Sequence, residues 1–318
     1  MQNEYTQTDG GAEQEMIGIV ILNYSAWEDT KRCVKSICKN TPANEYTIII
    51  VDNASDCAPN YDLSEFLKRY RILFIQNTKN LGYNAGNNAG IAKALEIGCS
   101  YILISNSDVR YFPQSILKMR DYLKRNPQAG IVGPKILDAK GRLQKSNLCR
   151  KTGMKEKYMV RTKARIFFRR SWQTYFGYDR DYERCFEVYA VLGCCFMMSE
   201  LCARAVTPLD EYPVLYEEEL MLGIRMEEAG FHTVYNPDSV VKHLHGGSTS
   251  RLKAFAFAQN VRSEIYYCKS YLHAPIWQIY PLCIYRVVLY ALRCIKYRDF
   301  RKNWKWFLHM LKKELYVV

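Results

Sequence analysis

The chain of 318 residues lacks the sequence features that define several other protein classes. None of its twelve cysteines lies in a Cys-x-x-Cys pair, so the spacing typical of zinc sites and redox motifs is absent. Most of them lie in apolar surroundings, which predicts buried, reduced thiols in a cytosolic protein. No run of about eighteen uncharged apolar residues exists, so we expect no ordinary membrane span. The polar, acidic residues 1–15 predict a disordered tail and not a signal peptide.

Several nucleotide-binding signatures are also missing. No glycine-rich segment ends in Gly-Lys-Ser/Thr, which excludes a P-loop, and none matches Gly-x-Gly-x-x-Gly, the dinucleotide fingerprint. No signature of an RNA- or DNA-binding module is present, so we expect no nucleic-acid partner. There is no internal repeat either.

The net charge of +13 is concentrated in two segments. Residues 150–184 carry eleven Lys or Arg and four acids, and residues 251–318 carry thirteen and three, whereas the remainder of the chain is mildly acidic. This distribution favours an anionic partner for two basic appendages, and a membrane surface above all. Basic faces that only contact solvent are the alternative.

Apolar runs alternate with helical patterns, which predicts an α/β protein with a mostly parallel sheet flanked by helices. The predicted strands cover 17–22, 47–51, 71–75, 101–104, 131–136, 188–198, 232–235 and 239–242. The predicted helices cover 27–39, 63–69, 84–97, 113–125, 217–230 and 255–271. We expect one domain over 16–272, with a basic insertion of short helices at 150–186 and a basic, aromatic helical extension at 273–318.

Three polar segments between Asp52 and Asp108 are the most informative feature of the chain. Two of them directly follow apolar runs, and ligands in open α/β sheets bind beyond the carboxyl ends of the strands. These segments therefore predict a site for a nucleotide with a metal. They are Val51-Asp52-Asn53-Ala54-Ser55, the Asn/Gly-rich stretch 80–88, and Ser105-Asn106-Ser107-Asp108.

Each polar segment has a structural alternative beside its functional interpretation. Asp52 is placed to accept a hydrogen bond from a pyrimidine N–H, with Asn23 beside it, but both residue types also cap turns. The 80–88 stretch suits ribose and diphosphate oxygens at a helix start, but it is also a turn followed by a helix. Asn106 and Asp108 could hold a hard divalent cation, and His243 or His245 could complete that site.

Glu217, Glu218 and Glu219 begin the helix predicted at 217–230. Acidic residues in a first helical turn are favourable for dipole reasons alone. At the edge of a pocket, one of these carboxylates could instead act as a general base that deprotonates an acceptor hydroxyl.

The order of these motifs along the chain resembles that of the family 2 glycosyltransferases, particularly the bacterial rhamnosyltransferase-like members. The similarity runs from about Ile17 to about Tyr271 and is most specific at the Asn/Gly-rich segment. It rests on Ile21-Leu22-Asn23-Tyr24, Val51-Asp52-Asn53-Ala54-Ser55, Asn80 to Ile91, Ser105-Asn106-Ser107-Asp108, Gly193 to Met198, Tyr216-Glu217-Glu218-Glu219-Leu220 and His243 to Ser248.

The resemblance implies a Rossmann-like GT-A fold and inverting transfer from a nucleotide-activated sugar, a UDP- or dTDP-sugar. It assigns Asp108 and His243 to a divalent metal, Mg or Mn, and Glu219 to the catalytic base, with Glu218 as the alternative. Asn106 stands where the family usually has the first acid of an Asp-x-Asp motif. The implied nucleotide-sugar contacts are Asn23, Asp52, Asn53, Asn80, Gly82, Asn87 and Asn106.

The acceptor implied is a glycan or lipid-linked glycan used in cell-surface polysaccharide synthesis. The basic aromatic extension suits the headgroup region of an anionic bilayer, so we expect a cytoplasmic protein peripheral to the inner face of the cell membrane. A helix pair that packs on the domain or forms a homodimer contact is the alternative. Two other functions stay open from the residues alone: a nucleotidyltransferase, and a non-catalytic protein that binds nucleotide sugars.

Overall fold

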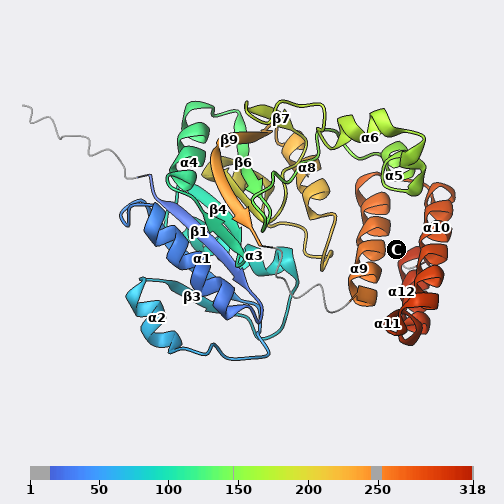
Figure 1. The fold of residues 1–318 in the computed structure, drawn as a ribbon, viewed down its shortest axis with the longest axis horizontal. Helices are drawn as coiled ribbons and strands as arrows, with labels where there is room; N and C mark the ends of the chain where they lie inside the picture. Colours follow the sequence, from blue (N-terminus) through green and yellow to red (C-terminus); the bar gives the residue numbers. More distant parts are fainter. Residues whose placement is uncertain (1–14, 146, 245–252, 317–318) are drawn as a thin grey trace, which may run out of the picture.

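The computed structural model describes residues 15–145, 147–244 and 253–316, and these form a sheet-based domain beside a helical bundle (Figure 1). Almost all of the tail expected at 1–15 lies outside the described residues. The described strands form one nine-stranded sheet with the order β3-β2-β1-β4-β8-β6-β9-β5, and β7 pairs with β9.

The first half of the sheet is parallel, as the alternation of strands and helices predicts. Three of its strands, at 17–23, 46–52 and 101–106, are short runs of mainly apolar residues that are buried on both faces, which is typical of parallel sheets. The elements of this half are β1 (Ile17–Asn23), α1 (Trp27–Asn40), β2 (Tyr46–Asp52), α2 (Leu63–Arg69), β3 (Leu73–Gln76), α3 (Tyr83–Glu96) and β4 (Tyr101–Asn106).

The second half makes the sheet mixed. Strand β8 (Cys195–Ser199) runs antiparallel to both β4 and β6 (Ala129–Leu137), and β6 then pairs in parallel with β9 (His232–His243). The short strands β5 (Val109–Tyr111) and β7 (Phe186–Val188) run antiparallel to β9. The strands β8, β5 and β7 therefore oppose the direction that the other strands share.

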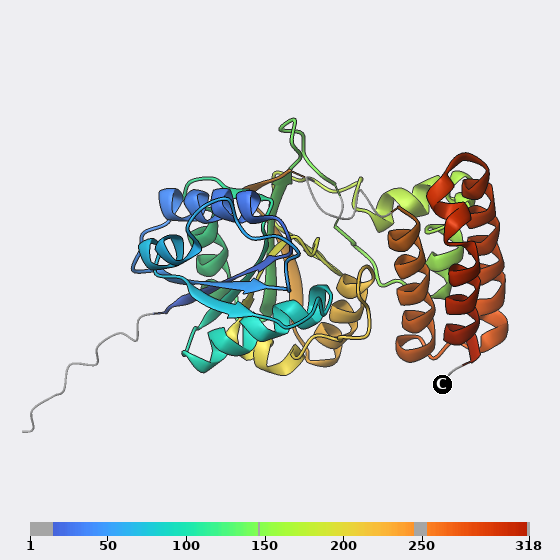
Figure 2. The ribbon, with the colours of Figure 1, turned by 90° about the horizontal axis from the view of Figure 1, so that it is seen from below.

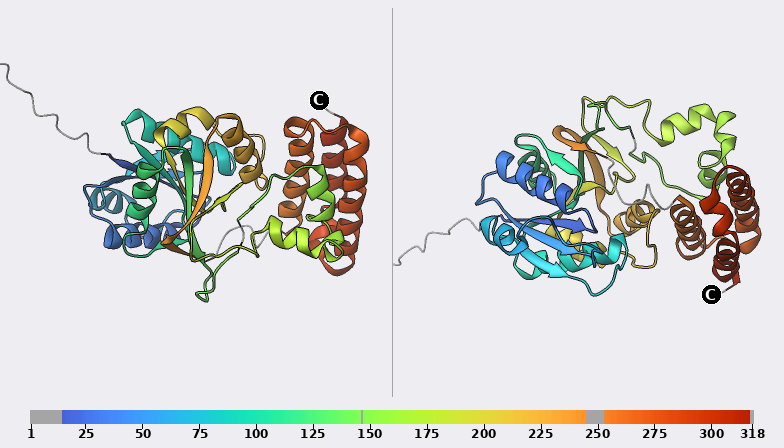
Figure 3. Two further views of the ribbon diagram at one scale, coloured as in Figure 1. Left: turned by 90° about the horizontal axis from the view of Figure 1, so that it is seen from above. Right: turned by 60° about the horizontal axis from the view of Figure 1, so that its bottom comes forward.

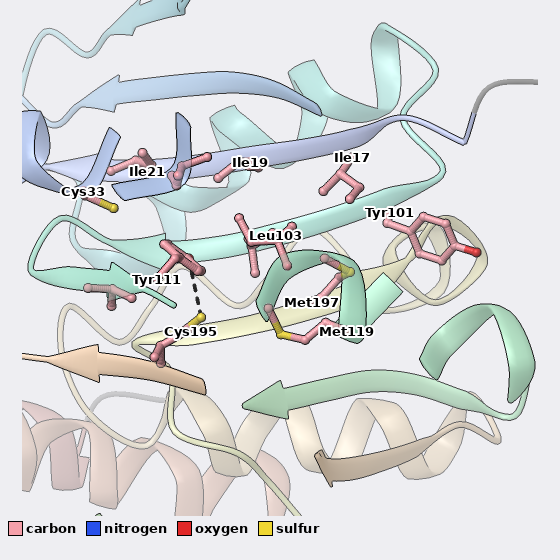
Figure 4. Close-up of a cluster of buried hydrophobic side chains, with 14 of the residues drawn as sticks. Ile17, Ile19, Ile21, Cys33, Tyr101, Leu103, Tyr111, Met119, Cys195 and Met197 are labelled. Carbon is pink, nitrogen blue, oxygen red and sulfur yellow. Dashed lines mark hydrogen bonds between the residues drawn. The ribbon is translucent and has the colours of Figure 1, made fainter. Parts of the chain in front are cut away.

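Helices cover both faces of the sheet (Figure 2). Helices α1, α2 and α4 (Ser115–Arg125) pack on one face, over a core in which Ile19, Leu103 and Met197 are fully buried (Figure 4). Helices α3, α7 (Glu200–Val206) and α8 (Glu218–Glu228) pack on the other face. Burial of these two apolar layers is the main stabilising contribution to this domain.

Two predicted strand boundaries are wrong. The single strand expected at 188–198 is divided into β7 and β8, because the backbone between them makes other contacts: Leu148 O accepts from the N–H groups of Tyr189 and Ala190. The two strands expected at 232–235 and 239–242 are one strand, β9. A register shift opposite Pro134–Lys135 accommodates the Asn236-Pro237-Asp238 segment, so the strand continues through it.

The basic insertion folds into short helices that lie beside a bundle of C-terminal helices (Figure 1). The insertion comprises α5 (Met154–Met159), the 3₁₀ helix η1 (Lys163–Ile166) and α6 (Arg169–Tyr175). The bundle comprises α9 (Lys253–Tyr266), the π-helix η3 (Tyr267–Tyr271), α10 (Ile276–Lys296), α11 (Arg298–Lys302) and α12 (Trp304–Tyr316). Helix α9 shares the apolar core of this bundle with α10, α11 and α12.

In the described part of the chain, α10 alone is long and apolar enough to cross a membrane by length and composition. The sequence predicted no span here because Arg286 interrupts the apolar run of α10. One side of the helix, with Leu282, Cys283 and Tyr290, is packed inside the bundle. Because one side of α10 is packed against protein, its length and composition are weak evidence that it crosses a membrane.

Candidate active site

The register of the parallel strands brings the predicted site residues to one edge of the sheet. Asn23 ends β1 directly beside Asp52 at the end of β2, and Asn106 at the end of β4 is the partner of Leu22. The carboxyl ends of three adjacent strands, β2, β1 and β4, therefore carry Asp52, Asn23 and Asn106 at the edge where open α/β sheets bind their ligands.

Asn23 and Asp52 form a buried hydrogen-bonded pair. Asn23 Nδ2 donates to Asp52 Oδ1 over 2.8 Å, and Thr30 Oγ1 in α1 donates to Asn23 Oδ1. Asp52 also accepts from the hydroxyl and the backbone N–H of Ser55, and only 1% of its surface is exposed. The carboxylate thus orders the turn after β2, and its contact with a base stays a prediction.

Asn53 holds the Asn/Gly-rich segment in place. Its Nδ2 donates to Asn80 Oδ1 (2.9 Å) and to Gly82 O (3.0 Å), while its Oδ1 accepts from Asn77 Nδ2 and Leu81 N. The Asn53 amide thus donates two hydrogen bonds and accepts two, all within the protein. Asn53 therefore shapes the loop on which Asn80 and Gly82 lie.

Gly82 is required at the N-terminal end of α3 by its backbone. Its φ of +88° is a conformation that residues with a side chain rarely adopt, and a Cβ there would lie 3.1 Å from Val214 Cα. The next residue, Tyr83, donates its N–H to Val214 O over 3.2 Å. The loop before α3 is thereby packed against the segment that leads to Glu217.

Asn87 lies inside α3 and is fully buried. Its Nδ2 donates to Tyr83 O one turn earlier, while its Oδ1 has no partner among the described residues. A buried amide oxygen without a partner is unfavourable unless a ligand or water satisfies it. This orphan acceptor is consistent with the predicted ligand contact of Asn87.

Asp108 and His243 lie together on neighbouring strands. Val109 in β5 pairs with His243 in β9, and this register brings His243 Nε2 to 3.3 Å from Asp108 Oδ1. Both side chains are largely buried. The alternative histidine, His245, lies outside the described residues.

The pair fits part of a divalent metal site. A separation of 3.3 Å between a carboxylate oxygen and an imidazole nitrogen suits two ligands that bind one ion side by side, and Mg²⁺ sites commonly complete their shell with substrate phosphates and water. The described residues contain no group of three or more His, Cys, Asp or Glu side chains that could enclose an ion. A metal here would be held by Asp108 and His243 together with the ligand.

Glu218 and Glu219 are the first two residues of α8, and both line an apolar cavity with Tyr83, Tyr189 and Gly193. The N–H of Gly193 donates to Glu219 Oε1 over 3.1 Å. Burial raises the pKa of Glu218 to about 8, and the charge of Glu219 adds to the effect. Burial also raises the pKa of Glu219, although the hydrogen bond from Gly193 opposes this. Carboxylates with raised pKa values in a cavity are suited to proton transfer.

Glu217, the residue before this pair, is also buried but makes different contacts. Lys157 Nζ lies 2.6 Å from Glu217 Oε2, and Arg161 Nη2 lies 3.0 Å from Glu217 Oε1. Burial alone would raise the pKa of Glu217, but the two cations outweigh it and hold this pKa below the ordinary value. The network continues to Glu264 in α9, which pairs with Arg286 in α10 over 2.7 Å.

Sequence reasoning did not identify Lys157 and Arg161. They lie four residues apart, Lys157 inside α5 and Arg161 two residues beyond its end, in a segment with no regular apolar period. A cation pair at this spacing is the only signal that could have indicated a shared partner.

The family model for glycosyl transferase family 2 matches residues 18–200, more than half of the chain. This span includes the polar ends of β1, β2 and β4. The chain belongs to glycosyl transferase family 2. It is therefore a glycosyltransferase that uses a nucleotide-sugar donor, and the nucleotidyltransferase interpretation is not supported.

A curated relative extends the similarity beyond that span. The N-acetylglucosaminyl-diphospho-decaprenol L-rhamnosyltransferase of Mycobacterium tuberculosis is 26% identical over 259 residues, which cover 78% of this chain and 82% of the relative. The low-salt glycan biosynthesis hexosyltransferase Agl10 of Haloferax volcanii is 27% identical over 126 residues, 39% of this chain and 38% of the relative.

Solved structures confirm the GT-A-like fold. The structure of GalNAc-T7 with UDP, GalNAc and Mn²⁺ matches with a TM-score of 0.57 at 14% identity, over 81% of this chain and 51% of that one. The Staphylococcus aureus TarS 1–349 complex with UDP-GlcNAc matches with a TM-score of 0.52 at 11% identity, over 80% and 67%. The chain thus spans about half the length of the first of these structures and two thirds of the second.

Proposed function

We propose that this glycosyltransferase moves a hexose, of which rhamnose is the leading candidate, from a UDP- or dTDP-sugar to a hydroxyl of a lipid-linked glycan with inversion at the anomeric carbon. The observation that carries the proposal is that the Gly193–Cys194 backbone contacts both Asn106, two residues before Asp108, and Glu219 of the raised-pKa pair. Asn106 N donates to Cys194 O over 2.8 Å, and Gly193 N donates to Glu219, so this short segment joins the two halves of the site.

The chemistry is a single displacement. Glu219 in its deprotonated form takes the acceptor O–H proton while the oxygen attacks the anomeric carbon. The bond from that carbon to the diphosphate breaks on the opposite face, and a nucleoside diphosphate leaves. The apolar cavity keeps Glu219 basic by excluding water, and holding two substrates together supplies much of the rate.

A divalent cation, Mg²⁺ or Mn²⁺, held by Asp108 and His243 would neutralise the charge that develops on the departing diphosphate. The GalNAc-T7 structure, which holds Mn²⁺ together with UDP, supports this choice by analogy of fold. The buried carboxylate–imidazole pair supports it from this chain's own residues.

The lipid-linked acceptor is supported by the M. tuberculosis relative, whose name specifies a decaprenol-linked acceptor and which aligns over most of both chains. The basic helical extension supports a protein that works at a membrane, and we place it in the cytoplasm at the inner face of the cell membrane. Cell-surface polysaccharide synthesis is the process that consumes such products.

The first experiment measures release of nucleoside diphosphate across a panel of UDP-, dTDP- and GDP-sugars, with Mg²⁺, Mn²⁺ or EDTA. Metal-dependent release from one donor would identify that donor and support the proposed reaction. The panel is repeated with a polyprenol-diphosphate-linked GlcNAc acceptor, and nuclear magnetic resonance of the product gives the anomeric configuration. Absence of turnover with every donor and acceptor, together with no thermal shift on adding nucleotides, would favour the non-catalytic alternative.

A further inference from the structure

The insertion and the helical bundle lie at the end of the molecule remote from α1 and α2 (Figure 3), and both carry exposed large apolar side chains. In the insertion, Ile166 is 73% exposed and Phe167 is 86% exposed. On α10, Ile284 is 60% exposed and Ile295 is 78% exposed. Solvent contact over so many large apolar groups is unusual for a surface that has no partner.

The exposed residues of α10 follow the period of the helix. Trp277, Ile284, Val288 and Ile295 all lie within a narrow sector of the helix and form one stripe along its length. The opposite side of α10 packs into the bundle core through Ile279 and Tyr290. The helix therefore has two apolar faces, of which the protein buries only one.

The insertion and α10 are in direct contact. The backbone N–H of Lys163, at the start of η1, donates to Tyr285 Oη over 3.0 Å, and Arg286 Nη2 donates to Arg161 O. The tip formed by Ile166–Phe168 follows directly in the chain. The two basic segments that are far apart in sequence are thus neighbours in space.

Within the two segments that carry these apolar groups, all charged side chains are Lys or Arg. The tip is flanked by exposed Lys163, Arg165, Arg169 and Arg170, and α10 ends in Arg293 and Lys296. Residues 157–178 and 276–296 contain no Asp or Glu. Apolar and aromatic groups bordered by Lys and Arg match the interface of an anionic bilayer, where the rings enter the headgroup region and the cations contact phosphate.

We propose that the insertion tip Ile166–Phe168 and the exposed stripe of α10 together form a docking face for an anionic lipid membrane. This inference rests on the proposed lipid-linked acceptor, which a docked protein would meet at the membrane. The insertion that carries the tip also reaches the proposed active site, since its Lys157 and Arg161 contact Glu217. Docking would bring a membrane-anchored acceptor to Glu219 and Glu218.

The test uses the full chain and vesicles of phosphatidylcholine, with or without phosphatidylglycerol, in the absence of any donor or acceptor. Two variants remove the apolar groups, Ile166→Ser with Phe167→Ser and Ile284→Ser with Ile295→Ser. Leu201→Ser is the matched control, because Leu201 is 73% exposed on α7 outside the proposed face. We expect the wild type and the control to co-sediment with anionic vesicles, and each double variant to bind roughly tenfold or more weakly.

Three results would overturn the proposal: no vesicle binding by the wild type, double variants that bind as well as the control, or a dimer that the double variants convert to monomer without any vesicle binding. Retention of the protein in cell membranes after alkaline carbonate extraction would also overturn it, since α10 would then be a span. Turnover of a water-soluble acceptor analogue by the double variants separates failure of docking from failure of the proposed reaction.

Discussion

The ammonium group of Lys157 lies 2.6 Å from Glu217 Oε2, and both side chains are buried. Glu217 and the preceding Tyr216 adopt left-handed backbone conformations, with φ of +67° and +73°. Residues with side chains adopt this conformation only where the surroundings enforce it. The ion pair therefore fixes the backbone from which Glu218 and Glu219 project, and it ties these two proposed catalytic residues to the basic insertion.

Removing the cation should destabilise the protein strongly. Lys157→Met leaves the buried Glu217 with Arg161 as its remaining close cation, and breaking a buried pair typically costs about 3–5 kcal/mol. Thermal and urea unfolding measure this loss. Lys151→Met is the control, because its exposed bridge to Glu227 should contribute under about 1 kcal/mol. Similar stability losses in the two variants would show that the buried pair has no special importance.

The stabilisation by Glu217 should depend on pH in the acid range. Its pKa in the folded protein lies below the ordinary carboxyl value, so its contribution is complete at neutral pH. That contribution is lost as the pH falls through the lowered pKa. The difference in melting temperature between wild type and Lys157→Met should therefore shrink on acidification, and a constant difference down to the acid unfolding limit would contradict the assignment.

The two catalytic candidates can be separated by their pH–rate profiles. If Glu219 is the base, Glu219→Gln lowers kcat by roughly 10²- to 10⁴-fold. Glu218→Gln should keep activity and leave the rising acidic limb of kcat/KM nearly in place, because the raised pKa of Glu218 keeps this group uncharged while Glu219 ionises. The reverse pattern, an inactive Glu218→Gln and an active Glu219→Gln, would make Glu218 the base.

Loss of the carboxylate of Asp108, the proposed metal ligand, should abolish the response to metal. Asp108→Asn is expected to lower kcat by roughly 10²- to 10³-fold, and its residual activity should be equal with Mn²⁺ and with EDTA. Asp121→Asn, which changes a half-exposed acid on α4, should retain the metal response. Direct titration of Mn²⁺ by electron paramagnetic resonance, with nucleotide present, checks binding independently of turnover. Unaltered Mn²⁺ binding by Asp108→Asn would exclude this residue as a ligand.

The loop before α3 should depend on Asn53. Asn53→Ala removes the donor to Gly82 O and the acceptor for Leu81 N, and each buried group left unsatisfied is worth about 1–3 kcal/mol. We expect a higher KM for the nucleotide sugar with a smaller change in kcat. Asn126→Ala, at an exposed helix end, is the control. A KM equal to that of the control would mean that the loop does not contribute to donor binding.

The sequence predicted the parallel half of the fold well, because each strand there is a short apolar run that ends in a polar residue. It also indicated Asp108 and His243 separately through the order of motifs. Their 3.3 Å approach depends on the pairing of β5 with β9, two strands far apart in the chain, and no local pattern encodes that register. The division of 188–198 was missed for a similar reason, since tertiary contacts of the backbone override the apolar pattern there.

The sequence could not predict the contacts of Glu217, because acidic residues at the start of a helix are expected for dipole reasons alone. Only the folded chain brings Lys157 and Arg161 against it. The same holds for the joined surface of the insertion and α10, which depends on contacts such as that of Lys163 with Tyr285.

The order of the sheet has a consequence for how the chain is synthesised. Strand β6 lies between β8 and β9, and both of these neighbours are encoded later in the chain. Strands β1 to β4 can pair as they leave the ribosome, but β6 then presents two open edges with apolar Ile131 and Val132 until β8 has been translated, and one open edge until β9 follows. Such unpaired edges are where nascent chains aggregate or bind chaperones. Ribosome-bound chains that stop between β6 and β8 should accordingly be the most dependent on chaperones.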